Sequence, residues 1–299
     1  MGRMHADEVD IDADLVRRLL AASFPHWADL PLTKVDSVGT VNAMYRLGTD
    51  LAVRLPLIPG GAADIGLEQR WLPGLAPHLP VAVPEVIGVG EPTDDYPWPW
   101  SVNRWLTGCN PTVDTLAEPE DLAIDLAEFI AALRAVDPTG GPELGRGGPL
   151  ADRDEETRAA IDASRGLIDT GALHGIWAET LTIVGSAGSA RPAWAHGDLS
   201  PGNVLLDGGR LNAVIDFGAF GVGDPTVDLI VAWNLLPEAA RPILRAALDV
   251  DDPTWARGRG WALSISVIQL PYYLHTNPAL ATNSRHVLEQ IIADQRRVG

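Results

Sequence analysis

Short runs of apolar and alternating residues fill most of the first hundred positions, and they predict a β-rich unit. Gly39 separates the first run from the second, and a turn at 48–50 separates the second from the third. Before these runs, Asp12 is placed to cap a short helix that ends before Pro25. In chain order, the later elements are strands at 32–38, 43–47 and 51–55, a helix at 62–75, and strands at 81–89 and 100–106.

After Gly108 the apolar spacing becomes that of amphipathic helices. Apolar residues between Leu122 and Leu133 recur at offsets of three and four, so they share one face of a helix that ends before Pro138. The elements expected beyond it are a loop at 140–149, helix to about residue 184, a hairpin of strands at 203–206 and 211–215, and mainly helix to the end.

The change in pattern predicts an α+β fold of two lobes. Residues 1–107 form a small β-rich lobe with one helix besides the N-terminal one, and residues 108–299 form a larger, mainly α-helical lobe. A chain of 299 residues with 46% hydrophobic residues is long and apolar enough to build both cores.

Composition and charge narrow the range of partners. The formal net charge of −18 disfavours nucleic acid as a partner and would attract a cation, although acidity also serves solubility alone. The single cysteine, Cys109, excludes an internal disulfide. The first residues lack the apolar core of a signal peptide, and polar residues interrupt the apolar stretch 261–274. We therefore expect a cytoplasmic protein with no membrane partner.

Two segments carry the strongest chemical signal. Residues 195–203 read Ala-His-Gly-Asp-Leu-Ser-Pro-Gly-Asn and place Asp198 five residues before Asn203, ahead of a predicted strand. Asp216 follows the next strand in Val-Ile-Asp-Phe-Gly. Phosphoryl transfer needs a carboxylate that orients the acceptor hydroxyl, and oxygen ligands that hold Mg²⁺ against the nucleotide phosphates. Each residue alone is ordinary in a turn, but together their order and spacing favour this chemistry.

These segments resemble those of the aminoglycoside phosphotransferase family, and most closely its bacterial aminoglycoside and macrolide phosphotransferase-like branch. The family shares the two-lobed fold of protein kinases and has His-Gly-Asp where eukaryotic protein kinases have His-Arg-Asp. The resemblance covers nearly the whole chain: 35–47 is similar to the nucleotide-binding hairpin, 51–56 to the third strand, 97–108 to the fifth strand and hinge, and 272–278 to a late helix.

The resemblance implies a role for each matching residue. Asp198 would be the catalytic base, and Asn203 and Asp216 would bind Mg²⁺. Backbone groups of Arg104 and Leu106 would contact the adenine ring of ATP. The expected protein is thus an ATP- and Mg²⁺-dependent small-molecule kinase.

The expected phosphate-binding residues depart from the protein-kinase pattern. The loop contains one glycine, Gly39, so Ser37, Thr40 and Asn42 are the polar candidates for nucleotide contact, although a plain hairpin turn explains them equally well. The basic residue of the third strand is Arg54, which is always charged and can grip phosphate oxygens in a bidentate manner. Glu68, in the predicted helix, is its expected partner, with a solvated glutamate as the alternative.

Several conspicuous residues have a structural interpretation. His196 is expected to brace the catalytic loop. Asp224 precedes Pro225 at a helix start, and Asp228 falls in the first turn, where the helix dipole favours a negative charge. The aromatic residues Tyr96, Trp98 and Trp100 are expected to pack rather than bind a ligand.

The acceptor is the least determined part of the prediction. The resemblance and the net charge favour a hydroxyl of a cationic small molecule, above all an aminoglycoside-type antibiotic. Macrolide kinases and metabolic small-molecule kinases are alternatives with the same chemistry, and a nucleotide-binding pseudokinase is a third that the complete set of Asp198, Asn203 and Asp216 disfavours. The sequence does not separate ATP from GTP, or a monomer from a homodimer.

Overall fold

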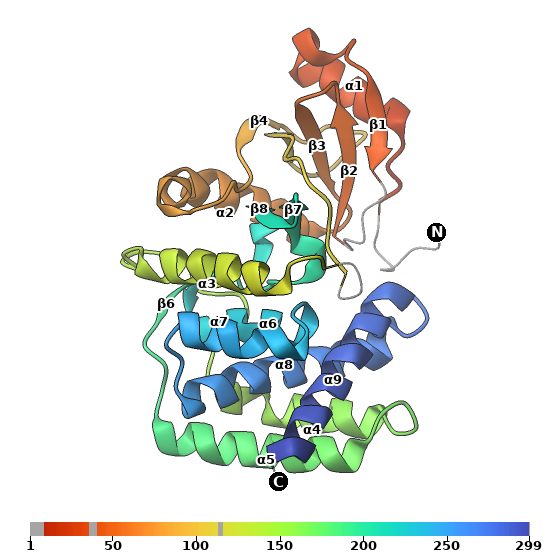
Figure 1. Ribbon diagram of the computed structural model, residues 1–299. Helices are drawn as coiled ribbons and strands as arrows, with labels where there is room; N and C mark the ends of the chain where they lie inside the picture. The colour runs from red at the N-terminus through yellow and green to blue at the C-terminus, as the bar shows by residue number, and fades with distance from the viewer. Residues whose placement is uncertain (1–8, 36–40, 113–115, 299) are drawn as a thin grey trace.

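The computed structural model describes residues 9–35, 41–112 and 116–298. Ser37, Gly39 and Thr40, three of the predicted nucleotide contacts, lie outside the described residues. Figure 1 shows a sheet and its helices at one end of the molecule and a larger helical part at the other. The division predicted between residues 107 and 108 stays a prediction.

An antiparallel sheet in the order β1-β2-β3-β5-β4 forms the first part. The predicted strand at 81–89 was too long at its start, because β4 begins after Pro84, which has no N–H to donate. The strands are β1 (Leu32–Val35), β2 (Asn42–Leu47), β3 (Leu51–Pro56), β4 (Val86–Gly90) and β5 (Trp100–Arg104).

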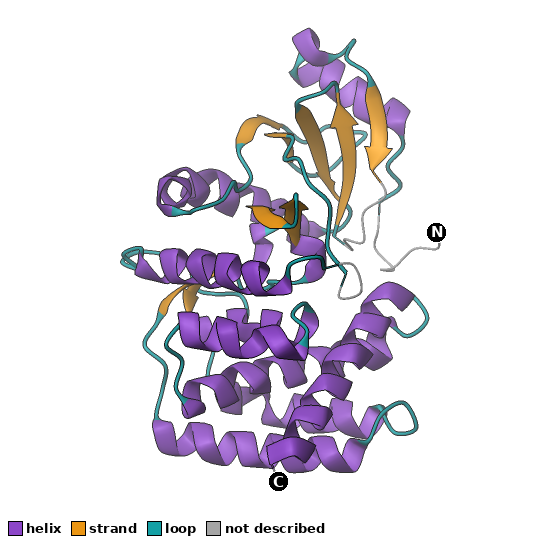
Figure 2. Ribbon diagram, viewed as in Figure 1, coloured by secondary structure: helices purple, strands orange, loops and turns teal. Residues whose placement is uncertain are grey.

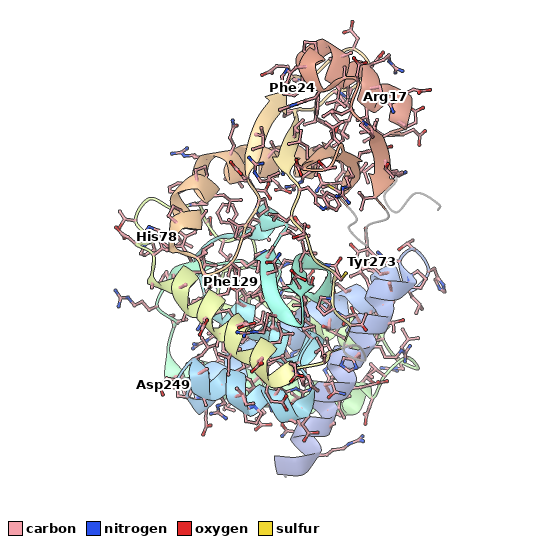
Figure 3. All side chains as sticks on the ribbon, turned by 45° about the horizontal axis from the view of Figure 1, so that its top comes forward. Arg17, Phe24, His78, Phe129, Asp249 and Tyr273 are labelled. Atoms are coloured by element: carbon pink, nitrogen blue, oxygen red, sulfur yellow. The ribbon has the colours of Figure 1, made fainter. Side chains whose placement is uncertain are left out.

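Helix α1 (Ala13–Ser23) covers this sheet. The Asp12 side chain accepts a hydrogen bond from the Leu15 amide at 2.8 Å, which confirms the predicted cap. The buried face of α1 packs in one hydrophobic cluster with inward residues of β2, β3 and β5. Phe24, at the end of α1 in Figure 3, meets Trp100 edge-on with ring centroids 5.5 Å apart. Tyr96 and Trp100 are fully buried here, so the predicted packing role is confirmed for both.

Helix α2 (Pro59–Leu75) extends from the sheet to the helical part. Its Leu72 and Leu75 pack in the second, larger hydrophobic cluster, which belongs to the helical part. Figure 2 shows that helices make up most of this second part. They are α3 (Pro119–Ala135), α4 (Asp154–Ala163), α5 (Thr170–Ala187), α6 (Val231–Asn234), α7 (Arg241–Ala247), α8 (Asp252–Tyr273) and α9 (Pro278–Val298). None of the helices in the described ranges is both long and apolar enough to cross a membrane.

Two small sheets lie between the helices. The predicted hairpin is present as β7 (Val204–Asp207) and β8 (Arg210–Val214), which pair antiparallel. The apolar pattern does not predict β6 (Ala193–Ala195) and β9 (Gly221–Gly223), which pair with each other on either side of the segment 196–220. Each has only three residues, too few for a visible period.

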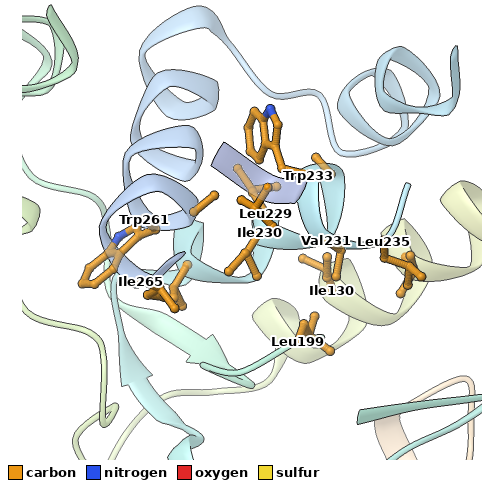
Figure 4. Close-up of a cluster of buried hydrophobic side chains, with 14 of the residues drawn as sticks. Ile130, Leu199, Leu229, Ile230, Val231, Trp233, Leu235, Trp261 and Ile265 are labelled. Carbon is orange, nitrogen blue, oxygen red and sulfur yellow. The ribbon is translucent and has the colours of Figure 1, made fainter. Parts of the chain in front are cut away.

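The larger core anchors the segment that carries Asp198. Leu199 is fully buried, and Figure 4 shows it near Ile130 of α3 and Val231 of α6. The Asn234 side chain donates to the Leu199 carbonyl at 2.8 Å. A buried leucine and a buried hydrogen bond therefore fix the chain directly after Asp198.

Candidate active site

Asp198 lies at the centre of a network of side chains from separate parts of the chain. The Asn203 side-chain amide donates to the Asp198 carbonyl at 2.8 Å and to its Oδ2 at 3.1 Å. Arg146 forms an ion pair with the other carboxylate oxygen, Oδ1. Arg146 comes from the 140–149 loop, and sequence reasoning missed it because a loop shows no periodicity that relates it to a residue 52 positions away.

His196 holds the catalytic loop through both ring nitrogens. Its Nε2 lies 3.0 Å from the Ile215 carbonyl, and its Nδ1 accepts from the Asp198 amide at 3.2 Å. These partners assign the proton to Nε2, since a carbonyl only accepts. The ring thus connects the segment before Asp216 to the backbone of Asp198, which confirms the predicted bracing role.

Asp228 has a larger role than the helix-dipole position predicted from sequence. It is 1% exposed, and its two carboxylate oxygens accept from the His196 amide at 2.8 Å and the Gly197 amide at 2.9 Å. Gly197 has φ +80, and a Cβ there would lie 2.7 Å from the Ala219 carbonyl oxygen, so only glycine fits. Burial raises the pKa of Asp228, although both N–H donors favour the charged form.

Replacing Asp228 with alanine should destabilise the fold by about 2–5 kcal/mol, because two buried backbone N–H groups lose their acceptor. Urea unfolding measures the change. Asp251→Ala is the matched comparison, since the exposed Asp251 accepts from the Thr254 amide at 2.9 Å at the start of α8, and about 1 kcal/mol is expected for a lost cap. Equal losses for the two variants would show that Asp228 is no special anchor.

The predicted partnership of Arg54 and Glu68 is present and buried. Arg54 Nη1 lies 2.6 Å from Glu68 Oε2, with side-chain exposures of 6% and 0%. The other oxygen of Glu68 accepts from the Phe217 amide at 3.1 Å, so the pair ties β3 and α2 to the segment after Asp216. Burial disfavours the Arg54 cation, but the negative charge of Glu68 and its neighbours outweighs burial and raises the pKa of Arg54.

Asp216 and Asn203 offer oxygens that suit Mg²⁺. Asp216 has a left-handed backbone, with φ 63 and ψ 69, and its side chain is 43% exposed. The Asn203 amide nitrogen donates to Asp198. The amide oxygen, Oδ1, has no hydrogen-bond partner among the residues that the structure describes. One carboxylate and one free amide oxygen match a hard cation that keeps other positions for water and phosphate oxygens. The residues present therefore fit Mg²⁺.

One side-chain nitrogen of Arg54 remains without a hydrogen-bond partner among the described residues. This nitrogen, Nη2, is buried and lies 3.9 Å from Asp216 Oδ1. A buried guanidinium with an unmatched N–H is costly unless an acceptor reaches it. A phosphate oxygen within hydrogen-bond distance of Nη2 would satisfy this donor.

Asp64 is a further carboxylate of this site that the sequence did not reveal. It lies on α2 one turn before Glu68, and its Oδ2 is 2.7 Å from the position that a Cβ on Gly218 would take. Burial raises the pKa of Asp64 to about 6, and the negative charges of Asp216 and Glu68 add to the rise while Arg54 opposes it. Only its position on the helix face of Glu68 could have indicated it.

Asp64→Asn should stabilise the ligand-free protein at pH 7.5 by about 1–2 kcal/mol, after allowance for solvent screening. The folded state holds the Asp64 proton more tightly than the unfolded chain, so ionisation costs stability above pH 6 and the cost fades as pH falls towards 4. Thermal unfolding across this range tests it, with the exposed Glu91→Gln as control. A gain that does not shrink at low pH would contradict the assignment.

Three of the predicted nucleotide contacts, Arg104, Leu106 and Asn42, differ in how their polar groups are already bonded. Arg104 donates its backbone N–H to the Glu85 carbonyl at 2.9 Å and pairs with the Glu85 side chain. The Leu106 amide has no hydrogen-bond partner among the described residues, so it is available to a ligand. The Asn42 side chain lies against the start of α2, where its Oδ1 is buried and has no hydrogen-bond partner in the part of the chain that the structure describes.

Comparison with known proteins places this geometry in a family. The model of the phosphotransferase enzyme family, APH, matches residues 33–261. A search of curated proteins gives no significant match.

Solved structures share the fold over nearly the whole chain. APH(2″)-IIIa in complex with GDP and kanamycin has a TM-score of 0.74 at 22% identity, over 94% of this chain and 99% of that one. APH(2″)-IIa with gentamicin gives 0.65 at 18%, over 94% and 97%. Macrolide 2′-phosphotransferase MphH from Brachybacterium faecium gives 0.62 at 25%, over 94% and 97%. The predicted kinase-like α+β fold is confirmed.

Proposed function

The chain belongs to the phosphotransferase enzyme family, and from this premise we propose that it transfers the γ-phosphoryl group of a nucleoside triphosphate to a hydroxyl of a small molecule. The observation that carries the proposal is the linked set of Asp198, Asn203 and Asp216 with the buried Arg54–Glu68 pair. A hydroxyl-orienting carboxylate, metal ligands and a phosphate-binding cation are the parts that phosphoryl transfer needs.

The nucleotide is assigned to the region between β3, α2 and the segment around Asp216. Arg54 would contact phosphate oxygens through its unpaired Nη2, and the Leu106 amide and Arg104 carbonyl would meet the base. Mg²⁺ held by Asp216 and Asn203 would neutralise charge on the phosphates. ATP is the expected donor. GTP is the alternative, since the related structures include complexes with GDP, ADP and ATP.

Asp198 acts on the acceptor. An acceptor hydroxyl that donates to Asp198 is oriented for in-line attack, and the carboxylate receives the proton as the new P–O bond forms and the bond to the nucleotide breaks. The hydrogen bonds from Asn203 and His196 fix the carboxylate and its backbone beforehand. Most of the rate enhancement then comes from positioning and charge neutralisation.

Within the class of small-molecule acceptors, we propose an aminoglycoside-type compound as the first candidate. The related structures with kanamycin and gentamicin support it, as does the net charge of −18. A macrolide is the alternative supported by the likeness to MphH at 25% identity. Two further hypotheses are a kinase of a metabolic small molecule and a pseudokinase that binds nucleotide without turnover.

Release of ADP from Mg²⁺-ATP tests the proposal, with kanamycin, erythromycin and small alcohols and acids as acceptors. We expect at least one acceptor to stimulate release above the acceptor-free rate. Nucleotide binding without stimulated release by any acceptor would favour the pseudokinase instead.

A further inference from the structure

A pocket of about 360 Å³ lies in the helical part, beside Arg146. The 143–149 loop, Arg153 and Trp261 of α8 line it. Arg146 belongs both to this lining and to the ion pair with Asp198, so the pocket leads to the carboxylate that the proposed function assigns to the acceptor. Its volume is that of a small-molecule site.

The half-buried and buried polar side chains of this lining offer donors and no acceptor. Arg146 and Arg153 have side-chain exposures of 32% and 25%, and neither guanidinium can accept a hydrogen bond. Arg153 already donates from Nε to the Ser264 hydroxyl at 2.8 Å and pairs through Nη2 with the exposed Glu156 at 3.3 Å, which leaves its Nη1 without a hydrogen-bond partner among the described residues. Trp261 is 1% exposed, and its indole N–H has no partner among the described residues. The two acids of the lining, Glu143 and Asp152, are exposed.

The backbone around Arg146 is held in place before any ligand binds. The Leu144 amide donates to the Val222 carbonyl at 3.1 Å and the Gly145 amide to the Ala219 carbonyl at 3.1 Å. A Cβ on Gly221 would lie 2.7 Å from the Glu143 carbonyl oxygen, so the loop packs directly on β9. A guanidinium on a fixed backbone is the kind of preorganised group that binding sites use.

We infer that the acceptor carries a negatively charged group, of the carboxylate type, near its reacting hydroxyl, and that Arg146, Arg153 and Trp261 bind this group. The inference rests on the proposed function. A carboxylate that pairs with Arg146 releases Oδ1 of Asp198 to the acceptor hydroxyl, so binding of the acceptor and exposure of the base occur together. An ammonium group at the same place could accept no hydrogen bond from either guanidinium, because all three groups only donate.

The net charge of the chain favours a cationic acceptor, whereas the two arginines of the pocket favour an anionic one. The chain's −18 charge is spread over its surface, and salt screens charges beyond about 8–10 Å. The arginines of the pocket act at contact distance, where screening is weak. Among the candidates of the proposed function, the pocket therefore favours a metabolic acceptor with a carboxylate over an aminoglycoside.

Calorimetric titration with three sugars that share one ring tests the inference: glucuronate (anionic), glucose (neutral) and glucosamine (cationic). We expect the full chain to bind glucuronate on the order of 10- to 100-fold more tightly than the other two, as charge-assisted hydrogen bonds imply. Arg153→Gln should remove most of this preference and Arg153→Lys should keep part of it. Arg158→Gln is the matched control, because Arg158 pairs with Asp154 and lies outside the lining.

Three results would overturn the inference: no detectable binding of glucuronate, binding of glucosamine as tight as that of glucuronate, or a preference that survives in Arg153→Gln. Because binding is measured without turnover, these results leave the proposed phosphotransfer untouched. Failure of the proposed function would appear elsewhere, as nucleotide binding without transfer to any acceptor.

Discussion

The Asp198→Ala variant is expected to lose turnover by a factor on the order of 10²–10⁴, the range for removal of a general base. Both carboxylate oxygens of Asp198 are already positioned, one by Asn203 and one by Arg146, so the fixed orientation is lost together with the proton acceptor. The Michaelis constant for ATP should change little, because Arg54, Glu68 and Asp216 are intact. Steady-state kinetics with a stimulating acceptor measure both.

The isosteric Asp198→Asn variant separates charge from shape. It keeps a side-chain oxygen that can accept from Asn203 Nδ2 but cannot take the hydroxyl proton at neutral pH. A comparable fall in both variants identifies the missing base as the cause. Near wild-type turnover in Asp198→Asn would limit the residue to positioning.

The second large effect is expected for Asp216→Asn, with a loss of about 10²-fold or more in turnover and a raised Mg²⁺ requirement. Asparagine tolerates the left-handed backbone seen at this position, so the substitution removes the charge without new backbone strain. Titration of activity with Mg²⁺ at saturating ATP measures the shift.

The chain provides a matched control for that change. Asp249 is the other non-glycine residue with positive φ in the described ranges, at φ 50, and it is exposed and far along the chain from the site. Asp249→Asn should leave the Mg²⁺ titration as in the wild type. An unchanged titration in Asp216→Asn as well would remove the metal role from Asp216.

Local sequence signals were enough for most regular elements. The Asp12 cap, the three-strand series β1–β3, the amphipathic face of α3 and the β7–β8 hairpin are set by neighbours in the chain, and the structure has each of them. The same holds for the spacing of Asp198 and Asn203, which lie in one continuous loop.

Residues that act through long-range contacts could not be predicted in this way. Arg146 meets Asp198 only because β9 and the 143–149 loop pack together, and no periodicity connects them. Asp228 was expected to serve its own helix, yet its oxygens bind the backbone of the catalytic loop some thirty residues earlier. Such contacts depend on the finished fold, and the pocket proposed for the acceptor is built from them.

The most direct test of the account is to follow the γ-phosphate itself. Labelled ATP is incubated with Mg²⁺, the stimulating acceptor and either the wild type or Asp198→Ala, and the label is then located. We expect label on the acceptor with the wild type, and labelling that is slower by a factor on the order of 10²–10⁴ with the variant. Label that appears only as free phosphate, or at the same rate on the acceptor with both proteins, would contradict it.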